Sequence, residues 1–139
     1  MKVNYSCPKC KGFLNIGGYL VFIIKAKNPP RKGLIFLSTE IGDYKVIKHP
    51  YLELEDDEIT DVFCPICNFN LKCSRNKNFA RIEMIDADQN RYEILFSRIV
   101  GEKCTYKIKG DKITEYGKHT SRYGSFRKLL QEDYPFKNM

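Results

Sequence analysis

The amino-acid sequence predicts a mainly β protein, a single domain of antiparallel hairpins that ends in a short helix. Short runs of β-branched and aromatic residues recur along the chain, turn-forming residues separate them, and apolar residues take helical spacing only near the C-terminus. The 139 residues, 42% of them hydrophobic, suffice for one core, and no linker or low-complexity tract divides them. We therefore treat residues 1–139 as one folded unit.

The first two strands are predicted at residues 19–25 (YLVFIIK) and 34–38 (LIFLS). Both runs are continuously apolar, which is typical of strands buried on both faces. The intervening segment KAKNPPRKG contains two prolines and a glycine, so we expect a hairpin-type loop there.

Seven further strands are predicted from shorter runs bounded by turn residues. They comprise residues 44–48, 51–55, 60–63, 79–86, 92–98, 105–109 and 112–116. Pro50 keeps the first two of these apart. The fourth and fifth pair across the turn-like DADQN, and the last two pair across a Gly-Asp turn. In that last hairpin we expect the side chains to alternate, with Tyr106 and Ile108 facing inward and Thr105 and Lys107 facing outward.

The helix is predicted in the C-terminal tail. Ser125 is a plausible N-cap, and Phe126, Leu129 and Leu130 follow at helical spacing. Pro135 is expected to stop the pattern after about two and a half turns.

The charge of the chain is strongly basic outside one acidic segment. The net charge is +7, yet six acidic residues and no basic ones occur at residues 53–61 (ELEDDEITD), so the remainder carries +13. An excess of Lys and Arg favours polyanionic partners such as nucleic acid. The acidic segment is interpreted as a solvated strand end and turn, although it could attract Mg²⁺ or a basic partner.

The strongest motif is a cysteine phrase that occurs twice, as SCPKCKGFLN and FCPICNFNLK, 57 residues apart. Two thiols three positions apart on a tight turn can bind one ion, and two such turns complete a tetrahedral zinc site. A residue just after each turn often has positive φ, which Gly12 and Asn68 would tolerate. The predicted ligands of one structural Zn²⁺ are Cys7, Cys10, Cys64 and Cys67.

The two phrases resemble the zinc knuckles of zinc-ribbon proteins, whose usual form is Cys-Pro-x-Cys-Gly followed by an apolar residue. Lys11 and Asn68 replace the usual glycine. In addition, 53 residues separate Cys10 from Cys64, against about 15 to 20 in the usual spacing. The resemblance implies a structural metal and, often, a role in binding nucleic acid or the machinery of transcription and translation.

Other uses of the cysteines remain open: four reduced thiols, a redox-active CxxC pair, or iron in a rubredoxin-like site. Cys73 could replace a ligand, whereas Cys104 is expected to be a small, semi-buried residue. His49 lacks the following glutamate that a zinc deaminase needs, and His119 is expected to be an ordinary polar residue. Four cysteines would also leave no open position for a catalytic water.

No nucleotide-binding or hydrolase motif occurs in the sequence, so we predict a protein that is not an enzyme. The absence of a signal peptide and of a long apolar run predicts a cytoplasmic protein without a membrane span.

The preferred functional hypothesis is a regulatory or ribosome- or transcription-associated protein that contacts RNA or DNA through a basic surface, with interleaved aromatic residues stacking on bases. The alternative is a protein-interaction adaptor in which the zinc is purely structural and the acidic segment or the C-terminal helix contacts the partner. The candidate phosphate-binding residues are Lys9, Lys11, Lys25, Lys27, Arg31, Lys32, Lys72, Arg75 and Lys77.

Overall fold

The structure, a computed structural model, describes the backbone of residues 3–137 and the side chains of residues 3–131. Within these residues the chain forms ten strands, a short 3₁₀ helix (η1, Thr120–Tyr123) and one α-helix (α1, Gly124–Lys137). The strands are β1 (Asn4–Ser6), β2 (Asn15–Ile16), β3 (Tyr19–Ala26), β4 (Arg31–Ser38), β5 (Val46–Lys48), β6 (Asp61–Phe63), β7 (Phe79–Ile85), β8 (Arg91–Ser97), β9 (Thr105–Lys109) and β10 (Lys112–Tyr116).

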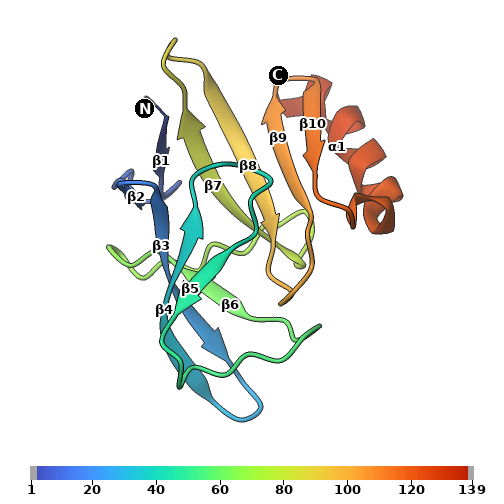
Figure 1. Cartoon of the computed structure of the whole chain (residues 1–139). Helices are drawn as coiled ribbons and strands as arrows, with labels where there is room; N and C mark the ends of the chain where they lie inside the picture. The colour runs from blue at the N-terminus through green and yellow to red at the C-terminus, as the bar shows by residue number, and fades with distance from the viewer. Residues whose placement is uncertain (1–2, 138–139) are drawn as a thin grey trace.

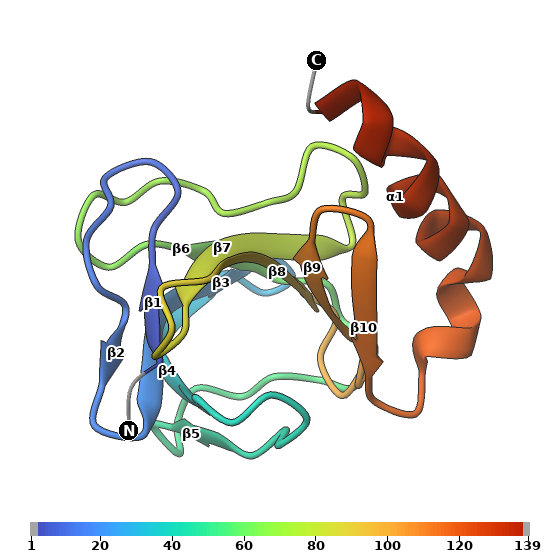
Figure 2. The ribbon, with the colours of Figure 1, turned by 90° about the horizontal axis from the view of Figure 1, so that it is seen from above.

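The strands form two antiparallel sheets, as predicted for a mainly β protein. The N-terminal sheet has the order β2-β3-β4-β5, with β6 also paired to β3, and the C-terminal sheet has the order β1-β7-β8-β9-β10. Figure 1 shows α1 beside β9 and β10, on the opposite side of the molecule from β2. Seen from above in Figure 2, β4 and β5 lie on one side of the core and β7 and β8 on the other.

The two halves of the chain repeat one strand pattern. In each half a cysteine turn is followed by three antiparallel strands, β3-β4-β5 in the first and β7-β8-β9 in the second. The registers agree along both pairs of strands. Tyr19 is opposite Ser38 where Phe79 is opposite Ser97, and Ile35 is opposite Lys48 where Ile94 is opposite Lys107. The repetition therefore extends well beyond the doubled cysteine phrase.

The strand before each cysteine turn pairs with the other half. Strand β1 lies against β7, with Ser6 opposite Glu83, and β6 lies against β3, with Phe63 opposite Ile23. These pairings occupy equivalent positions in the two sheets. Each half therefore supplies an edge strand to the sheet of the other.

The main core lies between the two sheets, where side chains of even-numbered residues on β3 and β7 face one another. A cavity of about 280 Å³ remains between these inner faces. Its lining is mostly apolar and comes from both sheets. The inward-facing residues of β3 and β7 are Leu20, Phe22, Ile24, Ala80, Ile82 and Met84.

The strand predictions are confirmed except at residues 51–55, which form no strand. The backbone N–H of Leu52 instead donates to the carbonyl of His49, closing a turn after β5, and the Leu52 side chain enters the core. Tyr51 is left 88% exposed. The segment leaves the edge of the sheet at this turn, so it has no strand to pair with.

Three predictions of side-chain burial are wrong. The residues of β3 alternate between buried and partly exposed, so one face of this strand, and not both, is buried. In residues 34–38 of β4 only Ile35 is buried and Leu34 is 50% exposed, so this strand is not buried on both faces either. Thr105 was expected to face outward but is buried, because its hydroxyl group lies 2.8 Å from that of Tyr44 in the loop before β5.

The C-terminal helix is longer than predicted. It runs from Gly124 to Lys137 and so continues past Pro135. Ser125 lies inside the helix, because η1 leads directly into it and Gly124 already has helical dihedral angles. The helix packs on the outer face of the C-terminal sheet, where Phe126 and Leu130 are buried.

None of the helices in the described part of the chain is long and apolar enough to cross a membrane.

Candidate metal centre

The two cysteine turns meet, and their four sulfur atoms form one cluster. The sulfurs of Cys7, Cys10, Cys64 and Cys67 all lie within 4.8 Å of one another. The Sγ atoms of Cys7 and Cys67 are 3.8 Å apart, and those of Cys10 and Cys64 are 3.9 Å apart. Four sulfurs bound tetrahedrally at 2.3 Å from one zinc ion are about 3.8 Å apart. The spacing therefore fits a four-coordinate metal ion.

Each cysteine turn is a short hairpin with the same hydrogen bonds. We call residues 5–14 the first knuckle and residues 62–71 the second knuckle. The N–H of Leu14 donates to the carbonyl of Tyr5 at 2.9 Å, and that of Leu71 donates to Val62 at 2.9 Å. Both leucines are buried, so they fix the base of each knuckle to the core.

Backbone N–H groups point at the sulfur atoms. The N–H groups of Lys9 and Gly12 each donate at 3.4 Å, to Cys7 and Cys10 respectively, and the N–H of Ile66 donates to Cys64 at 3.3 Å. Such bonds stabilise thiolates and reduce the net negative charge of a four-cysteine site.

The positive φ predicted after each turn occurs at Lys11 (63°) and Asn68 (64°). The prediction was right for Asn68 and wrong for Gly12, which lies one position too late. A Cβ atom at Gly12 would lie 2.5 Å from Cδ1 of Ile66 in the second knuckle, a clash that the exposed end of this flexible side chain can relieve. Lys9 of the first knuckle corresponds to Ile66 of the second, and Phe69 corresponds to Gly12. These two residues also meet, with Nζ of Lys9 5.3 Å from the ring centre of Phe69.

The surroundings do not favour four thiolates in the absence of a cation. Burial raises the pKa of the Cys7 thiol, and it raises the pKa of Cys64 to about 12. At Cys67 desolvation acts in the same direction, but the Phe69 N–H and the neighbouring thiols hold the pKa below its usual value. Four negative sulfurs so close together repel one another, and a metal ion offsets this repulsion.

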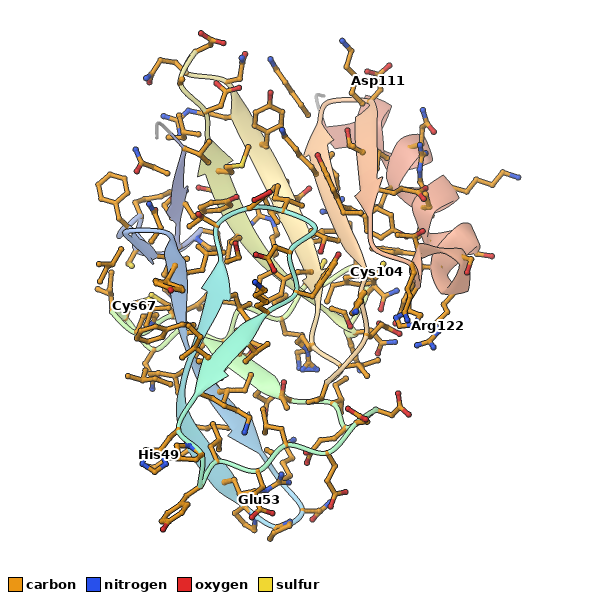
Figure 3. All side chains as sticks on the ribbon, viewed as in Figure 1. His49, Glu53, Cys67, Cys104, Asp111 and Arg122 are labelled. Carbon is orange, nitrogen blue, oxygen red and sulfur yellow. The ribbon has the colours of Figure 1, made fainter. Side chains whose placement is uncertain are left out.

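Cys73 and Cys104 lie outside the sulfur cluster. Both are buried among the apolar side chains under α1, together with Phe79 and Tyr106. Figure 3 shows Cys67 on the side of the molecule near β2 and Cys104 on the side near α1. Cys104 is therefore fully buried, rather than semi-buried as expected.

The two histidines are also apart from the sulfur cluster and accept backbone hydrogen bonds. Nδ1 of His49 accepts from the N–H of Tyr51 at 3.0 Å, and Nδ1 of His119 accepts from Lys103 at 2.9 Å. In the described part of the chain, the grouped metal-ligating side chains are cysteines alone.

The acidic segment folds back on basic residues of the same chain. Glu58 binds Arg31 through both carboxylate oxygens, and this ion pair lowers the pKa of the carboxyl group. Asp61 accepts a hydrogen bond from Arg98 at 3.2 Å. Part of the charge proposed to attract a partner is thus neutralised within the molecule.

The predicted phosphate-binding residues do not form one free basic patch. Four of the nine lie within 4.0 Å of an acidic side chain. The loop that joins β3 and β4 lies at the bottom of Figure 1. The residues that form these ion pairs are Lys11 with Glu83, Lys27 with Asp61, Arg31 with Glu58 and Arg75 with Glu93.

Of the other five predicted residues, Lys9 and Lys25 lie over the rings of Phe69 and Phe63. Lys32, Lys72 and Lys77 are exposed.

A feature that the sequence analysis missed is the outer face of the N-terminal sheet. Because paired residues of adjacent strands share a face, the register places eight apolar side chains there. We call these residues the apolar face. The sequence signal was the continuous apolar character of β3 and β4, which was interpreted as burial on both sides. The apolar face comprises Ile16, Tyr19, Val21, Ile23, Leu34, Phe36, Ile47 and Phe63.

The chain matches no protein-family model, and neither curated proteins nor solved structures show a significant match. Its class is therefore defined by the fold and the site alone: a mainly β protein of two antiparallel sheets with a four-cysteine cluster suited to a metal ion.

Proposed function

We propose that this chain is a non-enzymatic protein-interaction module stabilised by one structural zinc ion. Four cysteines in tetrahedral spacing are typical of structural zinc, and they leave no open position for a reacting water. Iron could take the same ligands, but it would colour the protein. The metal joins the two knuckles and thereby supports both sheets.

One observation carries the proposed interaction: four of the eight residues of the apolar face are exposed, and the other four are only partly buried. Ile16 is 74% exposed, Leu34 is 50% exposed and Ile47 is 49% exposed. Single exposed apolar residues are ordinary, but soluble monomers rarely expose large contiguous apolar patches unless these bind something. The partner surface that we propose is thus a sheet face, and not the acidic segment or the C-terminal helix, both of which contact other parts of the chain.

Affinity purification of the full chain from its native cell tests this function. We expect protein partners that survive nuclease treatment and that are lost from the double variant Leu34→Glu/Ile47→Glu. The matched control is Thr114→Glu, which adds a charge at an exposed strand position on β10. If the double variant keeps the same partners as the wild type, the proposal is wrong.

A second candidate function is binding of RNA or DNA beside the metal centre. It is favoured by exposed aromatic side chains on the knuckles, Phe13 at 66% and Phe69 at 38%, with Lys9 over the ring of Phe69. Aromatic rings and lysines in this combination can bind unpaired bases and phosphates.

Salt dependence separates the two functions. Phosphate contacts predict an affinity that falls steeply with salt, whereas an apolar protein interface should change little. We would abandon the nucleic-acid candidate if mixed RNA and DNA oligomers fail to bind at about 50 mM salt, where phosphate contacts are strong.

A further inference from the structure

The repeated strand pattern shows which part of the second half corresponds to the apolar face. Because Tyr19 and Phe79 hold equivalent positions in the two registers, so do Phe36 and Leu95, which lie one strand further along. Ile47 is opposite Phe36, just as Tyr106 is opposite Leu95. Three residues of the apolar face thus match Phe79, Leu95 and Tyr106 of the C-terminal sheet.

Those three residues of the C-terminal sheet are covered by α1. Phe126 of the helix stacks on Phe79, with ring centres 5.2 Å apart and an angle of 23° between the rings. The ring centres of Phe126 and Tyr106 are 6.0 Å apart. Leu130 of the helix belongs to the same apolar cluster and is only 1% exposed. Leu95, the third residue, is fully buried.

No such cover exists on the N-terminal sheet, since the single α-helix formed by residues 3–137 lies on the opposite side of the molecule (Figures 1 and 2). Tyr19 is 45% exposed, and Ile47 is 49% exposed. Equivalent positions in one chain therefore carry large apolar side chains with a helix above them in one half and without one in the other.

The difference continues beyond the positions that α1 covers. Glu83 and Glu93 are opposite one another on the outer face of the C-terminal sheet, where they form ion pairs with Lys11, Arg75 and Arg81. Their equivalents in the N-terminal sheet are Ile23 and Leu34, also opposite one another. The apolar face thus extends over the middle of β3 and β4, where an uncovered sheet would carry polar residues.

We propose that the apolar face docks an amphipathic α-helix of a partner protein, in the place that α1 occupies on the other sheet. This inference rests on the proposed interaction function and names the kind of segment that is bound. A helix with apolar residues at i, i+3, i+4 and i+7 would cover Tyr19, Phe36 and Ile47 as α1 covers their equivalents.

The charges beside the apolar face indicate the chemistry of that helix. Lys25 and Lys32 are opposite one another on the same outer face, next to Ile23 and Leu34. Asp61 of β6 is opposite Lys25, but its carboxylate already lies within 4.0 Å of Arg98 and Lys27. Two lysines at the margin of an apolar surface favour a partner with acidic side chains beside its apolar stripe. The occupant is therefore an acidic amphipathic helix, and a second copy of this chain is the competing possibility that the experiments test.

The first experiment measures the solution mass of the full chain by light scattering over a range of micromolar concentrations. We expect a monomer. A dimer that the Leu34→Glu variant dissociates would show that the apolar face binds a second copy, and this would overturn the inference.

The second experiment identifies the bound segment. Phe36 is replaced with the photoreactive residue p-benzoylphenylalanine in the full chain, produced in its native cell, and the cross-linked peptide is sequenced by mass spectrometry. The control carries the same residue in place of Tyr51, an exposed aromatic residue outside the apolar face. We expect the Phe36 position alone to cross-link to one segment of another protein, with helical apolar spacing and flanking acidic residues.

A synthetic peptide of the cross-linked segment completes the test. On adding the full chain, circular dichroism should show a gain of helix, and the Leu34→Glu variant should bind at least about tenfold more weakly, because it places a charge in an apolar contact. A segment that binds in extended form would overturn the helix inference and leave the interaction function intact. If Phe36 yields no protein cross-link, both fail, and a cross-link to nucleic acid would favour the second candidate function.

Discussion

The first and second halves of the chain share a strand pattern but differ in how they treat the outer face of their sheets. In the second half, Phe79, Leu95 and Tyr106 are buried under α1. In the first half the equivalent side chains are partly exposed. Two halves with the same framework thus have different surfaces, one covered within the chain and one available to a partner. Both halves build the main core, and the proposed interaction belongs to the first half because α1 occupies the equivalent surface of the second.

The sulfur cluster is the feature to which both halves contribute equally, two cysteines each, so its disruption should have the largest effect. We expect Cys7→Ser and Cys64→Ser, at equivalent positions of the two knuckles, to abolish metal binding and destabilise both sheets. The loss should be several kcal/mol, since structural zinc binds zinc-finger peptides with about 10 to 16 kcal/mol. Native mass spectrometry should find one zinc ion in the wild type, and thermal unfolding should report the change in stability.

The control for the metal prediction is Cys104→Ala, a buried cysteine outside the sulfur cluster, which should keep the metal. If hydrogen exchange shows that only one sheet loses protection in the ligand variants, the two halves do not depend on the metal equally.

The second prediction compares the two outer faces directly. Phe126→Ala removes a buried ring between α1 and the C-terminal sheet, and we expect a loss of about 3 to 5 kcal/mol in the free energy of unfolding. Leu34→Ala on the apolar face should change it by only about 0.5 kcal/mol, since this side chain is half exposed. Urea denaturation measures both. Equal losses would mean that something within the chain covers the apolar face.

The third prediction concerns pH and the attachment of the segment that leads into α1. Glu102 is buried, and its carboxylate accepts hydrogen bonds from Ser97, Tyr123 and Arg122. Desolvation acts to raise the pKa of this carboxyl, but the three hydrogen bonds outweigh it and hold the pKa below its usual value. The ionised Glu102 therefore stabilises the folded protein fully above the unfolded-state pKa of about 4.3. This stabilisation is lost as the pH falls through the lower pKa of the folded state.

We expect Glu102→Gln to destabilise the protein at neutral pH by less than Phe126→Ala does. The difference from the wild type should shrink as the pH falls below the unfolded pKa, and urea denaturation at a series of pH values checks this. A difference that stays constant with pH would contradict the assignment.

The smallest expected effects compare the two knuckles. Lys11 and Asn68 both have positive φ, where glycine is unstrained and asparagine is tolerated better than lysine. Lys11→Gly should therefore stabilise the protein by about 1 kcal/mol, less a small amount for the exposed ion pair with Glu83. Asn68→Gly should stabilise the protein by less than about 0.5 kcal/mol, because asparagine adopts positive φ readily. Thermal unfolding distinguishes the two, and a larger gain at Asn68 would contradict this ranking.

The four candidate ligands and most strands could be predicted from sequence because both depend on local patterns. Cys-x-x-Cys spacing is a property of one tight turn, and alternation or a turn residue indicates a strand. The strand predicted at residues 51–55 was wrong because pairing depends on a neighbouring strand, which the local sequence does not specify. Likewise, Pro135 predicted the end of the helix too early.

The repeat and the apolar face could not be found from local patterns. Some equivalent positions hold the same residue, such as Ile35 and Ile94, but others differ, such as Phe22 and Ile82, so the agreement is clearer in register than in identity. A run such as that of β3 can be buried by its own chain or by another molecule, and both cases give the same sequence. Only the three-dimensional arrangement shows which of its faces is left open.

The exchange of β1 and β6 between the sheets means that neither half is self-contained. A cut in the connection between β5 and β6 would give two fragments, each with half of the coordination shell and without the edge strand that completes its sheet. Such fragments should reconstitute the fold only when mixed, and only with metal present. Each fragment would depend on the other both for an edge strand and for the remaining two sulfur ligands.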